Sequence, residues 1–357
     1  MESEKYQNMK KLTIPIITIL LAAFFLSGCT GAGIATSWPG ITVTEDKVYT
    51  AYTQGVYAVS AANGSPLWHY PDKAGKMTFF AAPALAPDGQ LIVGDYSNSL
   101  HVIDTKTGTG RSIFTAEGKW IAQPIVDGDI IYAANADRIL YAIDMNGNLK
   151  WKFETGSLLW SNPMLIDGIV YLGAMDHYLY ALDAKTGQQV WKADAGGAII
   201  GNLVNANGSI FLGTMANEAV SINKANGKIN WRFTAGNAVW SGPAIKDGFL
   251  YFGDLDGNFY ALTESDRKLL WQYKTDGAIV GTPLLTDAGI FFTVENGNLV
   301  QLDYTGKLIY SKTLNGKLYG TPVVSGEQIL VGTTDKEKIL IALDSNGNQV
   351  WVLPQPK

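Results

Sequence analysis

The sequence predicts an all-β protein, an eight-bladed β-propeller in which each blade is a four-stranded antiparallel sheet. Three observations lead to this prediction. One phrase recurs about every 40 residues, each repeat holds short stretches that alternate apolar and polar residues, and Gly, Asn and Asp separate those stretches. The composition agrees, because 47% of the residues are hydrophobic, 17% are charged and 39 are Gly.

The first 28 residues differ from the rest and predict a secretory signal. Basic Lys5, Lys10 and Lys11 precede an apolar run from Leu12 to Leu26, whose 15 residues fall short of the roughly 20 that a membrane-spanning helix needs. The next residues, Ser-Gly-Cys, complete a segment that resembles a bacterial lipobox. In such a segment Cys29 becomes the lipid-modified first residue of the mature protein.

The predicted organisation is a signal peptide at 1–28, a lipidated cysteine with a short flexible linker at 29–37, and a propeller at 38–357. Either Met1 or Met9 can be the start of translation. The alternative for the cysteine is an ordinary buried side chain.

The anchor predicts where the protein works. Thr30 follows Cys29, in place of the aspartate that keeps many lipoproteins at the inner membrane. The expected location is the outer membrane, facing the periplasm, or the outer face of the cytoplasmic membrane in an organism with one membrane. Residues 30–37 span at most about 28 Å when extended, so the folded body is expected close to its membrane.

Charge and cysteine content exclude several classes of function. Residues 1–28 carry a net charge of +1, so the rest of the chain carries −6 of the total of −5. Such a charge does not attract nucleic acid. Cys29 is the only cysteine, so a lipidated chain has no thiol for a disulfide, a cysteine zinc site or a cysteine nucleophile.

The repeat is clearest in four copies: LYAIDMNGNLKW at 140–151, LYALDAKTGQQVW at 179–191, AVSINKANGKINW at 219–231 and FYALTESDRKLLW at 259–271. Weaker copies complete a column of eight aromatic residues, spaced by 37 to 46 positions: Trp68, Phe114, Trp151, Trp191, Trp231, Trp271, Tyr310 and Trp351. Eight copies predict eight blades.

Each copy contains four expected strands. In the fourth they are Trp160 to Ile166, Val170 to Met175, Leu179 to Asp183 and Gln189 to Ala193. In the first they are about 40–44, 47–52, 56–60 and 65–70, and the eighth copy ends at about 349–354. Asp183 to Gly187 is expected to form the hairpin between the third and fourth strands. The pattern does not say how the ring closes, and it contains no helical period after the signal.

The column tryptophans are predicted to be packing anchors. One indole per blade can dock on the adjacent blade while its N–H donates to a carbonyl. The alternative, a stacking platform for a ligand, is less favoured. The anchors are Trp68, Trp151, Trp191, Trp231, Trp271 and Trp351.

A second set of apolar residues is predicted at the mouth of the central channel. Its members lie three positions before the Pro, or its equivalent, that opens each first strand: Phe80, Ile121, Trp160, Ile200, Trp240, Val280 and Tyr319. The favoured interpretation is that they fill the narrow inner layer of the ring. The alternative is that Phe80, Trp160, Trp240 and Tyr319 bind a partner segment or a flat ligand.

The loops between second and third strands are expected on the same face, where they add an acidic rim. Asp176, His177, Asp254 and Asp256 are candidate binding residues in these loops. Asp254-Leu-Asp-Gly is also similar to part of a calcium loop, but it lacks the distal bidentate Glu, so an ordinary Asx turn is favoured.

No catalytic constellation is evident in the sequence. The three histidines, His69, His101 and His177, occupy different places in their repeats, so neither a histidine metal site nor a Ser-His-Asp triad is expected. The nucleophile elbow, the P-loop and the zinc-protease motif do not occur. The sequence therefore favours a binding protein without catalytic residues or metal.

The unit (L/F)-Y-A-(I/L)-D-x-x-(T/N)-G-x-x-x-W, followed by G-x-x-x-x-x-x-P and Y-x-G, resembles the pyrroloquinoline-quinone-like repeat over nearly all of 38–357. Two families carry this repeat: quinone-dependent dehydrogenases, and outer-membrane assembly lipoproteins of the BamB type. A lipobox, eight blades and about 330 mature residues resemble the second family. That resemblance implies a monomeric, non-catalytic scaffold whose partner is an envelope protein of the β-barrel assembly machinery.

Two alternatives stay open. A quinoprotein or redox lipoprotein would bind pyrroloquinoline quinone with calcium, but the adjacent cysteines of the quinoprotein alcohol dehydrogenases are absent here. The second alternative is an extracellular protein that binds polysaccharide or peptide, in an organism without an outer membrane.

Overall fold

The computed structural model describes residues 38–73, 75 and 77–355. The predicted signal peptide, Cys29 and the linker up to residue 37 lie outside the described residues. Within the described part, no helix has the length and apolar character needed to cross a membrane.

The described residues form eight four-stranded sheets, and each sheet uses four consecutive strands. The first four blades contain β1 (Gly40–Val43), β2 (Lys47–Tyr52), β3 (Gly55–Ser60) and β4 (Pro66–Tyr70); β5 (Ala84–Leu85), β6 (Gln90–Gly94), β7 (Ser99–Asp104) and β8 (Gly110–Thr115); β9 (Ile125–Asp127), β10 (Ile130–Ala134), β11 (Ile139–Asp144) and β12 (Leu149–Glu154); and β13 (Met164–Ile166), β14 (Ile169–Gly173), β15 (Tyr178–Asp183) and β16 (Gln189–Asp194).

The last four blades contain β17 (Val204–Ala206), β18 (Ser209–Thr214), β19 (Glu218–Asn223) and β20 (Ile229–Thr234); β21 (Ala244–Lys246), β22 (Phe249–Gly253), β23 (Asn258–Thr263) and β24 (Leu269–Lys274); β25 (Leu284–Thr286), β26 (Gly289–Thr293), β27 (Asn298–Leu302) and β28 (Leu308–Thr313); and β29 (Val323–Ser325), β30 (Gln328–Gly332), β31 (Lys338–Leu343) and β32 (Gln349–Pro354).

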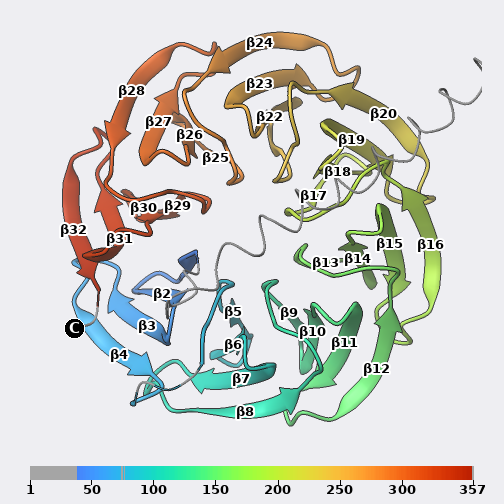
Figure 1. Ribbon diagram of the computed structural model, residues 1–357, viewed down its shortest axis with the longest axis vertical. Helices are drawn as coiled ribbons and strands as arrows, with labels where there is room; N and C mark the ends of the chain where they lie inside the picture. The colour runs from blue at the N-terminus through green and yellow to red at the C-terminus, as the bar shows by residue number, and fades with distance from the viewer. Residues whose placement is uncertain (1–37, 74, 76, 356–357) are drawn as a thin grey trace, which may run out of the picture. The chain divides into compact units, whose positions relative to one another are not determined.

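The sheets are arranged around a central axis, with the fourth strand of each blade at the perimeter (Figure 1). Neighbouring strands pair antiparallel, as Val170 does opposite Leu182 in the fourth blade. The predicted all-β, eight-bladed propeller is therefore confirmed.

Two strand bounds expected in the fourth blade are wrong, and one of them is the end of the second strand, since β14 ends at Gly173 and not at Met175. The first strand of the fourth blade was expected from Trp160, but β13 begins only at Met164. The residues before it bond to the neighbouring blade instead, since the Ser161 hydroxyl donates to the Gly201 carbonyl at 2.8 Å. The inner strand of the fourth blade is thus shorter than the apolar pattern suggests.

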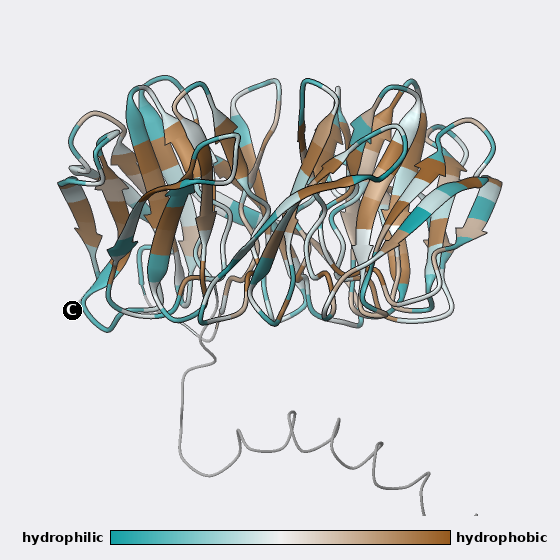
Figure 2. Cartoon of the chain, turned by 90° about the horizontal axis from the view of Figure 1, so that it is seen from above, coloured by the Kyte–Doolittle hydropathy of each residue, from teal (hydrophilic) through white to brown (hydrophobic). Residues whose placement is uncertain are grey.

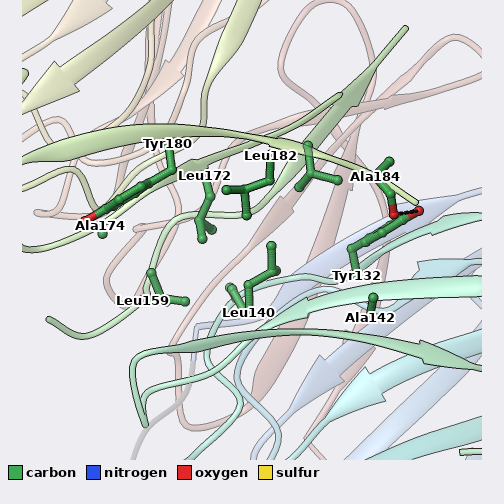
Figure 3. Packing of buried hydrophobic residues seen from close by; sticks show 12 residues of the cluster. Tyr132, Leu140, Ala142, Leu159, Leu172, Ala174, Tyr180, Leu182 and Ala184 are labelled. Atoms are coloured by element: carbon green, nitrogen blue, oxygen red, sulfur yellow. Dashed lines mark hydrogen bonds between the residues drawn. The ribbon is translucent and has the colours of Figure 1, made fainter. Parts of the chain in front are cut away.

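Blades are held together by apolar clusters that combine side chains of adjacent sheets. In one of them Tyr132 and Leu140 of the third blade pack with Leu172 and Leu182 of the fourth (Figure 3). The Tyr132 hydroxyl donates to the Ala184 carbonyl across this junction at 3.0 Å. Hydrophobic residues concentrate in the strands, while many loops are hydrophilic (Figure 2). The apolar surface whose burial stabilises the ring therefore lies between the blades.

The column tryptophans make the predicted contacts. The Nε1 atoms of four of them donate to carbonyls of the next blade at 2.9–3.1 Å: Trp68, Trp151, Trp231 and Trp271. The hairpin glycine of that next blade lies against the indole in five cases: Gly108 on Trp68, Gly187 on Trp151, Gly227 on Trp191, Gly306 on Trp271 and Gly64 on Trp351. These contacts agree with the interpretation of the column tryptophans as packing anchors.

The last of these pairs shows how the ring closes. Trp351 of β32 packs with Val48 and Val59 of the first blade in one apolar cluster, and β32 lies beside the first blade in Figure 1. A Cβ on Gly64 would come within 2.4 Å of the Trp351 ring. Within the described residues, the eighth blade thus closes on the first by the same tryptophan and glycine contact that joins other blades, without exchange of a strand.

Candidate functional site

The candidate site lies on the axis, at one face of the ring. Because successive strands run in opposite directions, the loops from second to third strands and from each fourth strand to the next blade share one face. We call it the mouth face. There a cavity of about 190 Å³ is lined by residues of all eight blades. All seven predicted mouth residues line it: Phe80, Ile121, Trp160, Ile200, Trp240, Val280 and Tyr319.

A further aromatic residue, Trp38, lies among them and was not predicted. Its ring is stacked on that of Tyr319, with 4.9 Å between centroids. It also contacts the rings of Phe80 at 5.2 Å and of Trp240 at 5.7 Å. Each such aromatic pair is worth about 0.5–1.5 kcal/mol beyond the burial of its surface. The aromatic Trp38 directly before Pro39 is the signal that could have identified it, but its place in the repeat differs from that of the other mouth residues.

Polar side chains form a collar beside the aromatic rings. They occupy the position directly before the first-strand Pro or its equivalent, and they bond from blade to blade. The Asn162 oxygen Oδ1 accepts from the Gln123 backbone N–H at 2.7 Å, and its Nδ2 donates to Asn202 Oδ1 at 2.8 Å. On the other side of the ring, the Thr282 N–H donates to Thr321 Oγ1 at 3.1 Å. All five side chains line the cavity.

Three lining residues have a buried polar atom without a hydrogen-bond partner among the described residues: Trp160 Nε1, Ser241 Oγ and Thr282 Oγ1. Ser241 is 4% exposed. An unsatisfied buried polar group lowers the stability of the fold by about 1–3 kcal/mol. Three such groups lie around this one cavity. Groups of this kind in a native fold call for a water, an ion or a ligand.

Among the described residues that line the cavity, none is Asp, Glu, Lys, Arg or His. Pyrroloquinoline quinone carries three carboxylates, and a buried charge needs a paired charge or a metal. Calcium in turn needs several oxygen ligands, usually including carboxylates. The described part of the chain also contains no group of three or more His, Cys, Asp or Glu that could hold a metal ion. The lining residues therefore do not fit this quinone with calcium.

An ion pair lies beside the Tyr319 ring. The Lys317 ammonium lies 2.6 Å from Glu295 Oε1, and the Tyr319 hydroxyl donates to the same oxygen at 3.0 Å. The bond from Lys317 lowers the pKa of Glu295, whereas burial raises the pKa of Tyr319. Glu295 thus orients the ring on which Trp38 is stacked.

The predicted acidic rim residues have structural contacts and lie outside the cavity lining. Asp176 Oδ2 accepts from the Gly156 N–H at 2.6 Å and from the Tyr180 hydroxyl at 2.7 Å. His177 is exposed in the same loop, with a φ of 76°. Asp256 is exposed, and its Oδ1 accepts from Asn237 Nδ2 at 2.7 Å.

Asp254 has the most extensive contacts of the four. It is 0% exposed, and its Oδ1 accepts from the N–H groups of Asp256 and Asn258 at 3.0 and 2.9 Å. Its Oδ2 accepts from Asn258 Nδ2, from the Tyr260 hydroxyl and from the Asn237 N–H at 2.8–3.2 Å. Burial raises the pKa of Tyr260 to about 12, so the phenol is a neutral donor. The expected Asx turn is confirmed, and its carboxylate faces the protein interior.

A buried chain of hydrogen bonds between the first and second blades was not expected. Tyr70 Oη lies 3.0 Å from His101 Nδ1, and His101 Nε2 lies 2.9 Å from Asp95 Oδ2. The third and fourth blades have Tyr141 and Tyr180 at the position that His101 occupies in the third strand of its blade. The hydroxyls of these tyrosines donate to the loop aspartates Asp137 and Asp176. Tyr70, His101 and Asp95 do not line the cavity. Their hydrogen bonds are therefore a variant of a structural contact that other blades repeat.

Comparison with known proteins agrees with this architecture. A family model described as outer membrane protein assembly factor BamB matches residues 52–173, 175–287 and 276–357. No curated protein matches the chain.

Two crystal structures illustrate the likeness of fold. BamB from Moraxella catarrhalis aligns with a TM-score of 0.70 at 18% identity, over 86% of this chain and 93% of that one. The computationally designed Ika8 protein aligns with a TM-score of 0.70 at 16% identity, over 90% of this chain and 98% of that one. Identities this low show a shared propeller fold alone.

Proposed function

The chain belongs to the family of the outer membrane protein assembly factor BamB, and from this premise we propose that it is a non-catalytic scaffold of the cell envelope. It binds another protein through the mouth face, and its partner is a component of the machinery that assembles outer-membrane β-barrels. The observation that carries this proposal is the family match, which spans nearly the whole propeller.

Exposed apolar side chains support the mouth face as the binding surface. Leu158 is 38% exposed in the loop that leads into the fourth blade, and Met215 is 37% exposed in the loop between β18 and β19 of the fifth. Among the described residues, the other exposed large apolar side chains belong to strands. Asp176 and His177 lie in a loop of the same face. Apolar side chains with a polar rim are typical of protein interfaces.

The composition of the cavity supports a function without quinone chemistry. The family's repeat is shared with quinoprotein enzymes, but the lining described above offers a tricarboxylate no cationic partner. Binding of another protein through the loops of the mouth face needs no cofactor.

We further propose that Cys29 carries a lipid that holds the protein at the outer membrane, or at the outer face of the cytoplasmic membrane in an organism with one membrane. The apolar run that precedes this cysteine supports the proposal. Two acyl chains on one residue are enough for stable anchoring.

The function is tested by in-cell chemical crosslinking of the full-length protein, followed by pull-down and mass spectrometry, beside a Cys29→Ser variant. We expect wild type to fractionate with membranes and to recover a β-barrel assembly protein. Cys29→Ser should lose the membrane fractionation and recover much less of that partner, because anchoring raises the local concentration of both proteins. Recovery of no envelope protein by wild type would contradict the scaffold, and membrane fractionation of Cys29→Ser would contradict the lipid anchor.

A further inference from the structure

We propose that the axial cavity is a binding site for one neutral, hydroxyl-bearing six-membered ring, namely a single hexose unit of a glycan. This proposal does not depend on the proposed protein partner, because the hexose would bind in the axial cavity and the partner would bind the exposed loops.

The size of the cavity sets the size of the ligand. A cavity of roughly 150 Å³ holds benzene, so about 190 Å³ takes one six-membered ring with some of its substituents. Pockets for drug-sized ligands begin near 300 Å³. One ring therefore matches the volume of the cavity better than a fused tricyclic compound does.

The residues that line the cavity indicate the chemical class of the ligand. Aromatic rings from separate blades, those of Phe80, Trp160, Trp240 and Tyr319, supply flat apolar surfaces. The amides of Gln123, Asn162 and Asn202 lie at the same cavity. A hexose presents both kinds of surface, since its C–H groups pack on aromatic rings and its hydroxyls both donate and accept hydrogen bonds.

The unsatisfied polar atoms separate a hexose from an aromatic side chain. Trp160 Nε1 needs an acceptor, while the hydroxyls of Ser241 and Thr282 need either an acceptor or a donor. A phenyl ring in the cavity would leave all three unpaired, whereas hexose hydroxyls can satisfy them. Because these atoms are buried, the ligand reaches them only when lining side chains, Trp160 itself among them, change position. Binding is therefore accompanied by a change in tryptophan fluorescence.

The absence of charge sets the last requirement. Among the described lining residues none is acidic or basic, so a carboxylate on the sugar would be buried without a partner. The site is expected to reject a uronic acid and to accept its neutral counterpart.

The test uses the full-length protein in a detergent whose headgroup is not a sugar. The probes are methyl β-glucopyranoside, methyl β-galactopyranoside and methyl N-acetyl-β-glucosaminide, with methyl β-glucuronide as the charged probe and p-cresol as the aromatic one. Binding is measured by saturation-transfer NMR and by tryptophan fluorescence. At least one neutral glycoside should bind with a Kd in the millimolar range, as is usual for so small a ligand, and more tightly than the glucuronide and p-cresol.

Two pairs of variants place the site. Trp160→Phe and Ser241→Ala each remove one unpaired polar group of the cavity and should weaken glycoside binding about five-fold, the value of one hydrogen bond. Trp120→Phe and Thr50→Val remove unpaired buried groups that lie outside the lining, and they should leave the Kd unchanged. Thermal unfolding shows that each variant is folded. The proposal is wrong if no neutral glycoside binds, if glucuronide or p-cresol binds as tightly, or if the two cavity variants bind like wild type.

Discussion

Replacing Gly187 by alanine is expected to destabilise the propeller by about 2–5 kcal/mol, one of the two largest effects that the structure predicts. Gly187 has a φ of +71°, a conformation that costs an L-residue about 1–2 kcal/mol. A Cβ there would also lie 2.6 Å from ring carbons of Trp151, and such overpacking costs a further 1–3 kcal/mol or so. The indole cannot retreat freely, because its Nε1 donates to the Ala184 carbonyl in the same hairpin.

Gly168→Ala is the matched control for this substitution. Gly168 lies in the same blade with a φ of +75°, but a Cβ there would meet no atom within 4 Å. It should therefore cost only the conformational part, about 1–2 kcal/mol. Equilibrium urea unfolding of both variants measures the difference, which isolates the contact between blades. Equal losses for the two substitutions would show that the tryptophan and glycine contact does not hold the ring together.

Asp254→Ala is the second substitution with a large expected effect, a loss of about 2–5 kcal/mol of stability, because each buried donor left unpaired costs about 1–3 kcal/mol. The carboxylate is fully buried and accepts bonds from backbone and side-chain donors of two neighbouring loops. Its removal leaves the Tyr260 hydroxyl and the amide of Asn258 in the interior without their acceptor, and such groups are costly when unpaired.

Asp256→Ala serves as the comparison, because its exposed carboxylate accepts one bond from an exposed amide. Its expected cost is within about 0.5 kcal/mol. Urea unfolding, with circular dichroism to confirm the fold, distinguishes the two. A mild effect for Asp254→Ala would mean that its carboxylate is not needed for folding, and it would restore this residue as a candidate for binding a partner.

The sequence predicted the repeat architecture well because each blade has the same local signals. In the fourth blade, Gln189 begins β16 and Asp183 ends β15 where the alternation and the turn residues place them. The tryptophan column could be interpreted because a large indole recurring at one place in a repeat has to pack on the next copy. Both inferences use contacts that every blade repeats.

The features that sequence reasoning missed depend on contacts between different blades. Trp38 precedes the first strand at a position where other blades have Asn162 or Thr282, so the repeat assigned it no role. Its contact with Trp240 joins the first blade to the sixth, and no local pattern encodes a contact across the axis. Closure of the ring is a similar case, because the apolar pattern does not say which strands meet.

Burial is the other quantity that the sequence did not supply. Asp254 and Asp256 belong to the same short loop and have the same chemistry, yet one is fully buried and the other is exposed. The difference arises from Asn258 and Tyr260, whose donors enclose the first carboxylate. Candidate binding residues chosen by residue type alone therefore combined structural and exposed side chains.

The most direct test of the proposed scaffold is photocrosslinking in living cells from one exposed position on each side of the ring. A photoreactive amino acid at Met215 samples the mouth face, and one at Val190, 55% exposed near the start of β16, samples the region beside the opposite face. We predict that an envelope protein of the β-barrel assembly machinery is crosslinked from Met215 and not from Val190. Crosslinking of that partner from Val190 alone, or of no envelope protein from either position, would contradict the assignment of the mouth face as the surface through which this propeller works.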